Sequence, residues 1–272
     1  MSQVETSVVP PAPEPSPGKT RPGRVNLNAI LIEGRALIAL VLIIAIFSLM
    51  SENYLTVDNL ILMTRHVAIN AILAVGLLLV ILNGGIDLSV GSAVGLSGVV
   101  AGYLLQGFPL PFSEAVAYPS VLLVILIAVA VGSLVGYING IVIARLGVAP
   151  FIATLGMLYI ARGIALLITN GETFTKLRGD PDLGNTGFLT TLAGTPLGIP
   201  MPIWLMFAFA IVFSIVLNRT AFGRWLYATG GNERAAELSG VPVRRVKILV
   251  YVLSGFCAGT VGLLLTAAIA TA

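Results

Sequence analysis

The sequence predicts an all-α, polytopic membrane protein, because few of its residues are charged and its apolar residues form long segments. Of the 272 residues, 57% are hydrophobic and only 10% are charged, whereas soluble domains carry about 25% charged residues. A water-soluble core could not bury this much apolar surface. The 30 glycines are typical of helices that pack closely in lipid. We therefore expect a helical bundle in contact with a lipid bilayer.

The first residues are polar and rich in proline. The segment VVPPAPEPSPGKTRPGR has too few apolar side chains to form a core, so we expect a disordered cytoplasmic tail over 1–29. The first apolar run begins at Ala36, and no small-residue cleavage site follows it. We interpret this run as an uncleaved first span. The remaining residues, 30–272, form the predicted membrane domain.

Seven apolar segments are predicted to span the bilayer. Several are shorter than the ~20 residues that cross a membrane, so we expect these to extend into flanking residues or to lie deep in the bundle. The segments are 36–50, 67–82, 90–106, 120–143, 151–168, 202–217 and 248–270.

Basic residues predict the orientation of these spans. Lys and Arg are enriched in cytoplasmic connections, and they gather before the first span and between the sixth and the seventh. Six crossings separate these two regions and return the chain to the same side, so we expect an inner-membrane protein with a cytoplasmic N-terminus. The net charge of +3 therefore marks topology rather than a nucleic-acid partner. The residues are Lys19, Arg21, Arg24, Arg35, Arg219, Arg224, Arg234, Arg244, Arg245 and Lys247.

A break between the second and third spans is predicted at NGGIDLSVGS, residues 83–92. Gly84 and Gly85 permit backbone angles that other residues resist, and Asp87 or Ser89 could cap the next helix. A capped turn is one interpretation. The other is a translocation path lined by Asn83, Asp87 and Ser89, because acids at membrane depth usually face a cavity and broken helices mark transport sites.

Small residues recur at four-residue spacing in several spans. Such spacing lets helices approach closely, and we favour packing within one subunit over subunit dimerisation as its purpose. Cys257 is the single cysteine and is interpreted as a small packing residue, without a disulfide or a metal site. The spaced glycines are Gly91, Gly95, Gly98, Gly102, Gly132, Gly136, Gly140, Gly255 and Gly259.

The connection between the sixth and seventh spans, at about 219–247, carries the most informative motif. Its middle, 232–238, is predicted to be a short helix that Gly240 and Pro242 end. This connection resembles the Glu-Ala-Ala loop of ATP-binding-cassette importer permeases. The resemblance implies a helix that docks on an ATPase subunit, whereas a solvated loop helix is the alternative. The residues that match, together with an Arg that interrupts the motif, are Glu233, Arg234, Ala235, Ala236 and Gly240.

Three motifs in order, GGIDLSVGS, GVAPFIATLGMLYIARGIALLITNG and this loop, resemble the ribose/xylose/galactoside branch of these permeases. The resemblance implies a permease subunit that moves a monosaccharide and binds no cofactor itself. It also implies a separate ATPase subunit, a periplasmic sugar-binding protein and a second permease copy, in a homodimer or a heterodimer. Members of this branch continue with further spans and a second glycine-rich motif, so we expect this chain to be C-terminally truncated.

Two other functions fit parts of the sequence. A secondary transporter or channel would need membrane carboxylates, of which only Asp87 is available. An intramembrane protease could use Ser97 within GLSG as its nucleophile, but the single histidine, His66, is predicted at the start of an earlier helix, where it is interpreted as an interfacial residue. Neither sequence pattern favours these functions over the permease.

Overall fold

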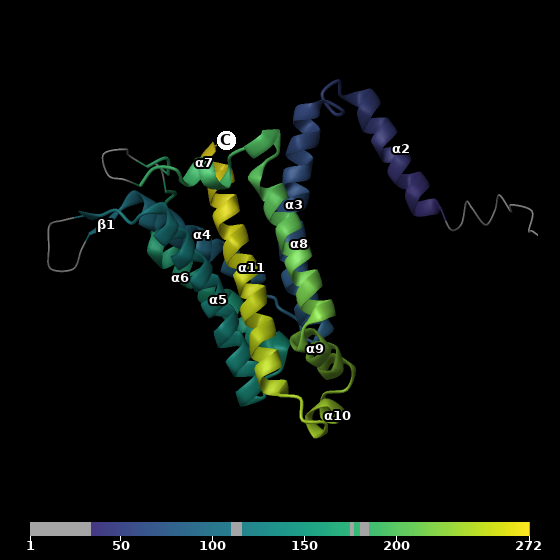
Figure 1. Cartoon of the computed structure of the whole chain (residues 1–272). Coiled ribbons are helices and arrows are strands. Elements are labelled where there is room, and N and C mark those ends of the chain that lie inside the picture. The colour runs from purple at the N-terminus through teal and green to yellow at the C-terminus, as the bar shows by residue number, and fades with distance from the viewer. Residues whose placement is uncertain (1–33, 110–115, 175–176, 180–184, 272) are drawn as a thin grey trace, which may run out of the picture. The chain divides into compact units, whose positions relative to one another are not determined.

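The computed structural model of the protein describes residues 34–109, 116–174, 177–179 and 185–271, and these are mostly helical, as predicted (Figure 1). The predicted tail at 1–29 lies outside the described residues. The chain divides into a first unit that ends at Thr56 and a second unit that begins at Val57. In the first unit, helix α2 (Arg35–Met50) is apolar and has no buried residue.

The second unit contains the other six predicted spans as helices. Within the described residues, five helices are long and apolar enough to cross a membrane, and α2 and α4 are shorter apolar helices. The all-α membrane fold is thus confirmed. The six helices are α3 (Val57–Leu82), α4 (Val90–Gln106), α5 (Val121–Leu146), α6 (Pro150–Thr169), α8 (Met201–Arg219) and α11 (Val243–Thr271).

Two helices begin earlier than the apolar pattern suggested. Helix α3 begins at Val57, so Arg65 and His66 lie inside it, and the expectation that His66 starts a helix is wrong. Helix α11 begins at Val243 and includes Lys247. Basic residues interrupt an apolar run without breaking a helix, because Lys and Arg have good helix propensity.

Short elements complete the second unit. Strands β1 (Phe108–Pro109) and β2 (Val116–Ala117) form an antiparallel pair, which is too small to alter the fold class. On the same side of the bundle, as Figure 1 shows, lies α7 (Phe188–Leu192), and a 3-10 turn, Pro196–Gly198, follows it. The opposite side carries α9 (Ala221–Gly231) and α10 (Glu233–Leu238).

Helix α11 is central to the second unit and packs against α5, α4 and α3 (Figure 1). At their glycine positions, α5 and α11 approach so closely that no side chain separates the two backbones. A Cβ added at Gly132 would lie 2.5 Å from the Gly255 carbonyl oxygen, and one added at Gly140 would lie 2.8 Å from Ile248 Cα. Packing within one subunit is therefore confirmed for these glycines. Gly91 and Gly95 differ, because added Cβ atoms there would meet nothing within 4 Å.

Candidate coupling and translocation site

Helix α10 forms where the sequence predicted a short helix. The Asn232 side chain accepts a hydrogen bond from the Ala235 amide at 2.9 Å and so caps its first turn. Gly240 follows it with a φ of 82°, a conformation that favours glycine. Ala236 is the one buried residue of α10, while Glu233, Arg234 and Ala235 are exposed.

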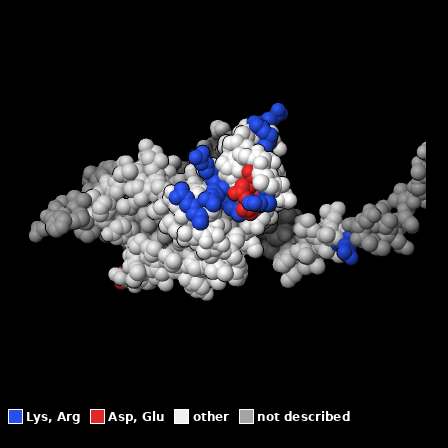
Figure 2. Space-filling view, turned by 90° about the horizontal axis from the view of Figure 1, so that it is seen from below, with Lys and Arg blue, Asp and Glu red and all other residues white. Residues whose placement is uncertain are grey.

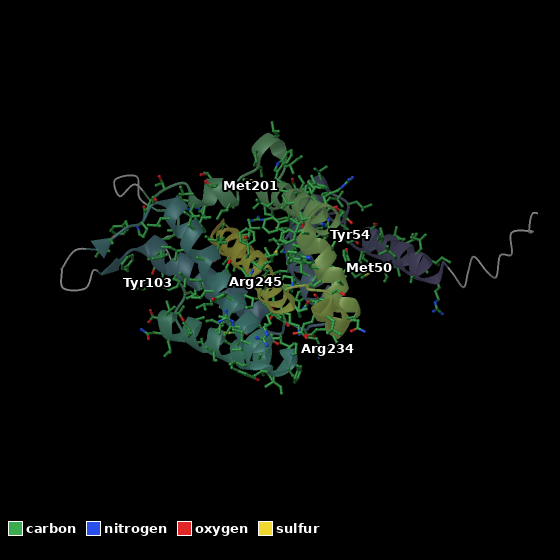
Figure 3. All side chains as sticks on the ribbon, turned by 60° about the horizontal axis from the view of Figure 1, so that its bottom comes forward. Met50, Tyr54, Tyr103, Met201, Arg234 and Arg245 are labelled. Atoms are coloured by element: carbon green, nitrogen blue, oxygen red, sulfur yellow. The ribbon has the colours of Figure 1, made fainter. Side chains whose placement is uncertain are left out.

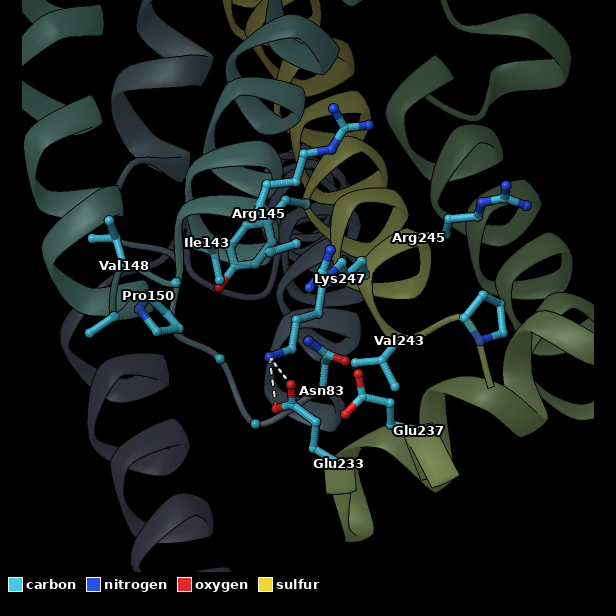
Figure 4. Close-up of a pocket in the computed structure, with 18 of the residues that line it drawn as sticks. Asn83, Ile143, Arg145, Val148, Pro150, Glu233, Glu237, Val243, Arg245 and Lys247 are labelled. Atoms are coloured by element: carbon cyan, nitrogen blue, oxygen red, sulfur yellow. Dashed lines mark hydrogen bonds and ion pairs between the residues drawn. The ribbon is translucent and has the colours of Figure 1, made fainter. Parts of the chain in front are cut away.

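An ion pair joins α10 to the start of α11. The Lys247 ammonium lies 2.7 Å from both oxygens of the Glu233 carboxylate (Figure 4). The Lys247 side chain is only 18% exposed, whereas that of Glu233 is 56% exposed. A second pair, between Arg234 and Glu237, is exposed on both sides and stays within α10. The Lys247 pair is therefore the one that connects two separate helices.

The same face of α11 continues from Lys247 into the bundle. Residues four and seven positions apart lie on one face of a helix, and Tyr251 and Ser254 occupy these positions after Lys247. The Tyr251 hydroxyl donates to the Ile86 carbonyl at 3.4 Å, and the Ser254 hydroxyl donates to Asp87 Oδ2 at 3.0 Å. One face of α11 thus contacts α10 at its start and the break between α3 and α4 farther along.

The break itself is held by a buried polar network. Asp87 Oδ1 accepts hydrogen bonds from the Ser89 amide at 3.0 Å and from the Ser89 hydroxyl at 2.7 Å. Asn139 of α5 donates to the Ser89 hydroxyl oxygen at 2.8 Å. With the bond from Ser254, every one of these side chains has a partner, as buried polar groups require. The network connects the break, α5 and α11.

A pocket of about 800 Å³ opens beside this network. Its walls come from the break, the end of α5, the turn into α6, α10 and the start of α11 (Figure 4). Lys and Arg side chains surround a smaller acidic cluster on this face (Figure 2). Arg234 and Arg245 lie at this end of the helices, and Met201 lies toward the other (Figure 3). The charged residues that line the pocket are Arg145, Glu233, Glu237, Arg244, Arg245 and Lys247.

The three predicted path residues occupy different surroundings. Asn83 lines the pocket, and its buried Oδ1 has no hydrogen-bond partner among the described residues. Asp87 and Ser89 are buried within the network and do not line the pocket. Asp87 accepts the amide of Ser89, the residue before α4, and so holds the turn that leads into this helix, whereas the Ser89 side chain makes no capping hydrogen bond to α4. A role of all three in translocation stays a prediction.

Four residues of this site were missed from sequence: Asn139, Lys247, Tyr251 and Ser254. Asn139 stands in an apolar segment between Gly136 and Gly140, and a polar residue beside a glycine-packed face is a usable signal for a buried hydrogen bond. The spacing of the other three along α11 is helical, but nothing in the sequence names their partners.

The chain matches the family of the branched-chain amino acid transport system permease component over residues 59–272. It belongs to this permease family. It is 38% identical to the ribose import permease protein RbsC of Haemophilus influenzae over 93% of this chain and 75% of that protein. It is also 34% identical to the L-arabinose ABC transporter permease protein AraH of Azospirillum brasilense, over 96% and 73%. No solved structure matches the chain significantly.

Family membership decides between the functions considered. The permease family consists of transport-system subunits, which supports the predicted permease over a secondary transporter or channel and over a protease. Ser97 is fully buried, and its hydroxyl oxygen has no hydrogen-bond partner among the described residues. His66 is exposed on α3. The Gly-x-Ser-Gly match is therefore a packing feature of α4.

Proposed function

We propose that the chain is the membrane subunit of an ATP-driven importer for a monosaccharide. Similar proteins are named for the import of ribose and the transport of L-arabinose, D-allose and galactofuranose, and all four are neutral sugars. The observation that carries the proposal is the contact of α10 with α11, because α11 also holds the helix break through Ser254. A force applied to α10 would reach the membrane interior along this route.

An ATPase subunit would apply that force by binding α10. Ala236 is buried against the rest of the chain, so the small, exposed side chain of Ala235 would allow close seating, and the exposed charges of Glu233 and Arg234 would orient the contact. The partners that the resemblance implied complete the proposed complex: a periplasmic sugar-binding protein on the other side and a second permease copy. The basic face around the pocket is then cytoplasmic, in agreement with the positive-inside rule.

Helix α11 would transmit the movement because a helix resists compression along its axis. Lys247 and Ser254 are about 10 Å apart at 1.5 Å per residue. The partly shielded Lys247–Glu233 pair is attracted more strongly than a fully exposed pair. When α10 moves, Lys247 would move with it, and Ser254 would pull on Asp87. The break would then change its conformation, which opens the path alternately to each side.

The pocket fits the cytoplasmic end of a sugar path. A neutral sugar that must leave quickly needs only a few polar contacts, and the half-buried Asn83 places one polar side chain on the pocket wall. Asp87 and Ser89 would shape the path by positioning the break rather than by touching the sugar in this conformation.

Co-purification and uptake test the proposed function. The native complex should contain a nucleotide-hydrolysing subunit, and vesicles that contain it should take up D-ribose, L-arabinose or a related sugar only with ATP and the binding protein. Complexes that never contain an ATPase, or uptake driven by a proton gradient without ATP, would contradict the proposal.

Charge exchange tests the route through Lys247. We expect Lys247→Gln to leave the ATPase bound but to raise the ATP hydrolysed per sugar several-fold, because α10 then moves without α11. Glu233→Lys combined with Lys247→Glu should restore part of the coupling. Arg245→Gln is the control, since it removes a charge from the same face while its side chain points away from Glu233 (Figure 4). Equal effects of Lys247→Gln and Arg245→Gln would reject the route.

A further inference from the structure

An arginine lies at membrane depth on the outward face of α6. Arg162 is exposed, and among the described residues no carboxylate lies within ion-pair distance of it. At 1.5 Å per residue, it is about 18 Å from Pro150 and about 10 Å from Thr169 along a helix that spans about 30 Å. Pro150 lines the pocket, so Arg162 lies in the half of α6 away from the pocket.

Arg162 is poorly placed to reach the nearer membrane surface. In a helix the Cα–Cβ bond leans toward the N-terminus, and for α6 that direction leads toward Pro150 and the bilayer centre. The guanidinium would have to turn back on itself to reach the surface beyond Thr169. A charged group at this depth usually faces a water-filled cavity or a polar partner rather than lipid.

A second polar group shares this face. Tyr159, three residues before Arg162, is 68% exposed and lies near the bilayer centre. The buried residues of α6 are Thr154, Met157 and Ala161, which place both side chains away from the packed side. Exposed residues of α8 at similar depth are apolar instead: Phe207, Ile211 and Val212. Most other exposed residues of α6 are apolar as well, including Ile160 and Leu166, so Tyr159 and Arg162 are the polar members of an otherwise apolar exposed face.

A second copy of this chain offers Arg162 no obvious counter-ion. Within the described membrane helices the acid is Asp58, in the first turn of α3. Asp87, in the break between α3 and α4, is buried and already accepts three hydrogen bonds in its own chain. An ion pair across a subunit contact is therefore less favoured than a contact with a polar solute.

We propose that Arg162 and Tyr159 line the sugar path on the far side of the break from the pocket. The guanidinium has five N–H donors in a planar fork that suits neighbouring hydroxyls, and the Tyr ring can cover the apolar face of a sugar. The ligand class is a neutral, hydroxyl-rich monosaccharide. This proposal rests on the proposed function, and it adds the residues that contact the solute.

Thiol accessibility tests the proposal in a Cys257→Ala background, since Cys257 is the single cysteine. The variants R162C and Y159C are compared with I211C, an exposed position of α8 at similar depth. A charged, membrane-impermeant thiosulfonate should label R162C and Y159C at least ten-fold faster than I211C in assembled complexes. Labelling should also abolish the D-ribose uptake that R162C and Y159C retain before treatment, whereas reagent treatment of I211C should leave its uptake unchanged.

Labelling of R162C at the rate of I211C would overturn the proposal, and so would an R162C disulfide between two copies that forms without labelling. The chemical variants give a second measurement: Arg162→Lys should retain more uptake than Arg162→Gln, with the same ATPase binding in both. Uptake by the background variant tests the proposed function separately, because labelling requires neither ATP nor transport.

Discussion

The strongest single prediction concerns Asp87, which holds the break to α11. Replacing it with Ala removes the acceptor for the Ser89 amide, the Ser89 hydroxyl and the Ser254 hydroxyl. Each buried donor left unpaired costs about 1–3 kcal/mol. The two hydroxyls can turn toward nearby carbonyl oxygens instead, but the amide has no such choice. We therefore expect Asp87→Ala to destabilise the packed position of α11 by about 3 kcal/mol. The fraction of molecules in which α11 has left that position should then rise by a factor of about 100.

Asp87→Asn should cost far less. Its amide oxygen can accept both bonds from Ser89, and its amide group can donate to the Ser254 hydroxyl, so the number of bonds is kept while the charge is lost. Because a charge-assisted hydrogen bond is stronger than a neutral one, we expect Asp87→Asn to destabilise the packed position of α11 by about 1 kcal/mol, which changes the open fraction by less than about ten-fold. The two variants therefore separate the geometry of the network from its charge.

Cys257 provides the measurement. It is the single cysteine, it is fully buried, and it lies one turn after Ser254 on α11. Its labelling rate by a thiol reagent in detergent reports how often α11 leaves its packed position. We expect the rate to rise about 100-fold in Asp87→Ala and less than ten-fold in Asp87→Asn, from the costs above. A rate in Asp87→Ala within three-fold of the wild-type rate would refute the holding role.

Sugar uptake by Asp87→Asn then addresses the translocation hypothesis. Loss of uptake with near wild-type labelling of Cys257 would assign the carboxylate charge to the transport path. Normal uptake would leave Asp87 the role of a cap and an anchor.

Three further predictions follow from the same contacts. Gly136→Ala should destabilise the fold by about 1–3 kcal/mol, because its Cβ would meet the Tyr251 carbonyl, and so raise the Cys257 labelling rate. Gly95→Ala, with open space around it, should leave that rate unchanged. Equal labelling rates in the two variants would contradict close α5–α11 packing. Asn232→Ala should destabilise α10 by about 1 kcal/mol, because the helix loses its cap. The ATPase subunit should then bind several-fold more weakly in a titration, and unchanged binding would count against docking through α10. Ala236→Arg should push α10 out of its packed position, because Ala236 is buried within the chain, and so uncouple ATP hydrolysis from uptake. Normal uptake by a stable complex would show that coupling does not need the packed position of α10.

The sequence predicted the membrane helices well because apolar composition alone determines them. It also predicted α10, since an Asn cap and a following glycine are local signals. The start of α3 was placed too late because Arg65 and His66 suggested a membrane surface, although helix formation tolerates both residues. Local signals thus indicated the membrane helices and α10 but not their exact lengths, and they did not indicate α7, α9 or the β1–β2 pair.

The contacts within the site could not be predicted because they join distant parts of the chain. Asp87 and Ser254 are separated by 167 positions, and their meeting depends on how closely glycines let α11 approach α5. Lys247 reaches Glu233 only because the chain reverses at Gly240 and Pro242. Which residues were polar was plain from the sequence; which of them shared a contact required the fold.

The glycine seam between α5 and α11 has a consequence for motion. Where two backbones touch without intervening side chains, sliding by even a fraction of a turn would drive a carbonyl into the opposing chain. The two helices should therefore move as one rigid body during transport, and the distance between spin labels on α5 and α11 should stay constant. A movement that begins at Lys247 would then displace Asn139 together with Ser254. The hydrogen bonds that hold Ser89 and Asp87 of the break would therefore shift at the same time.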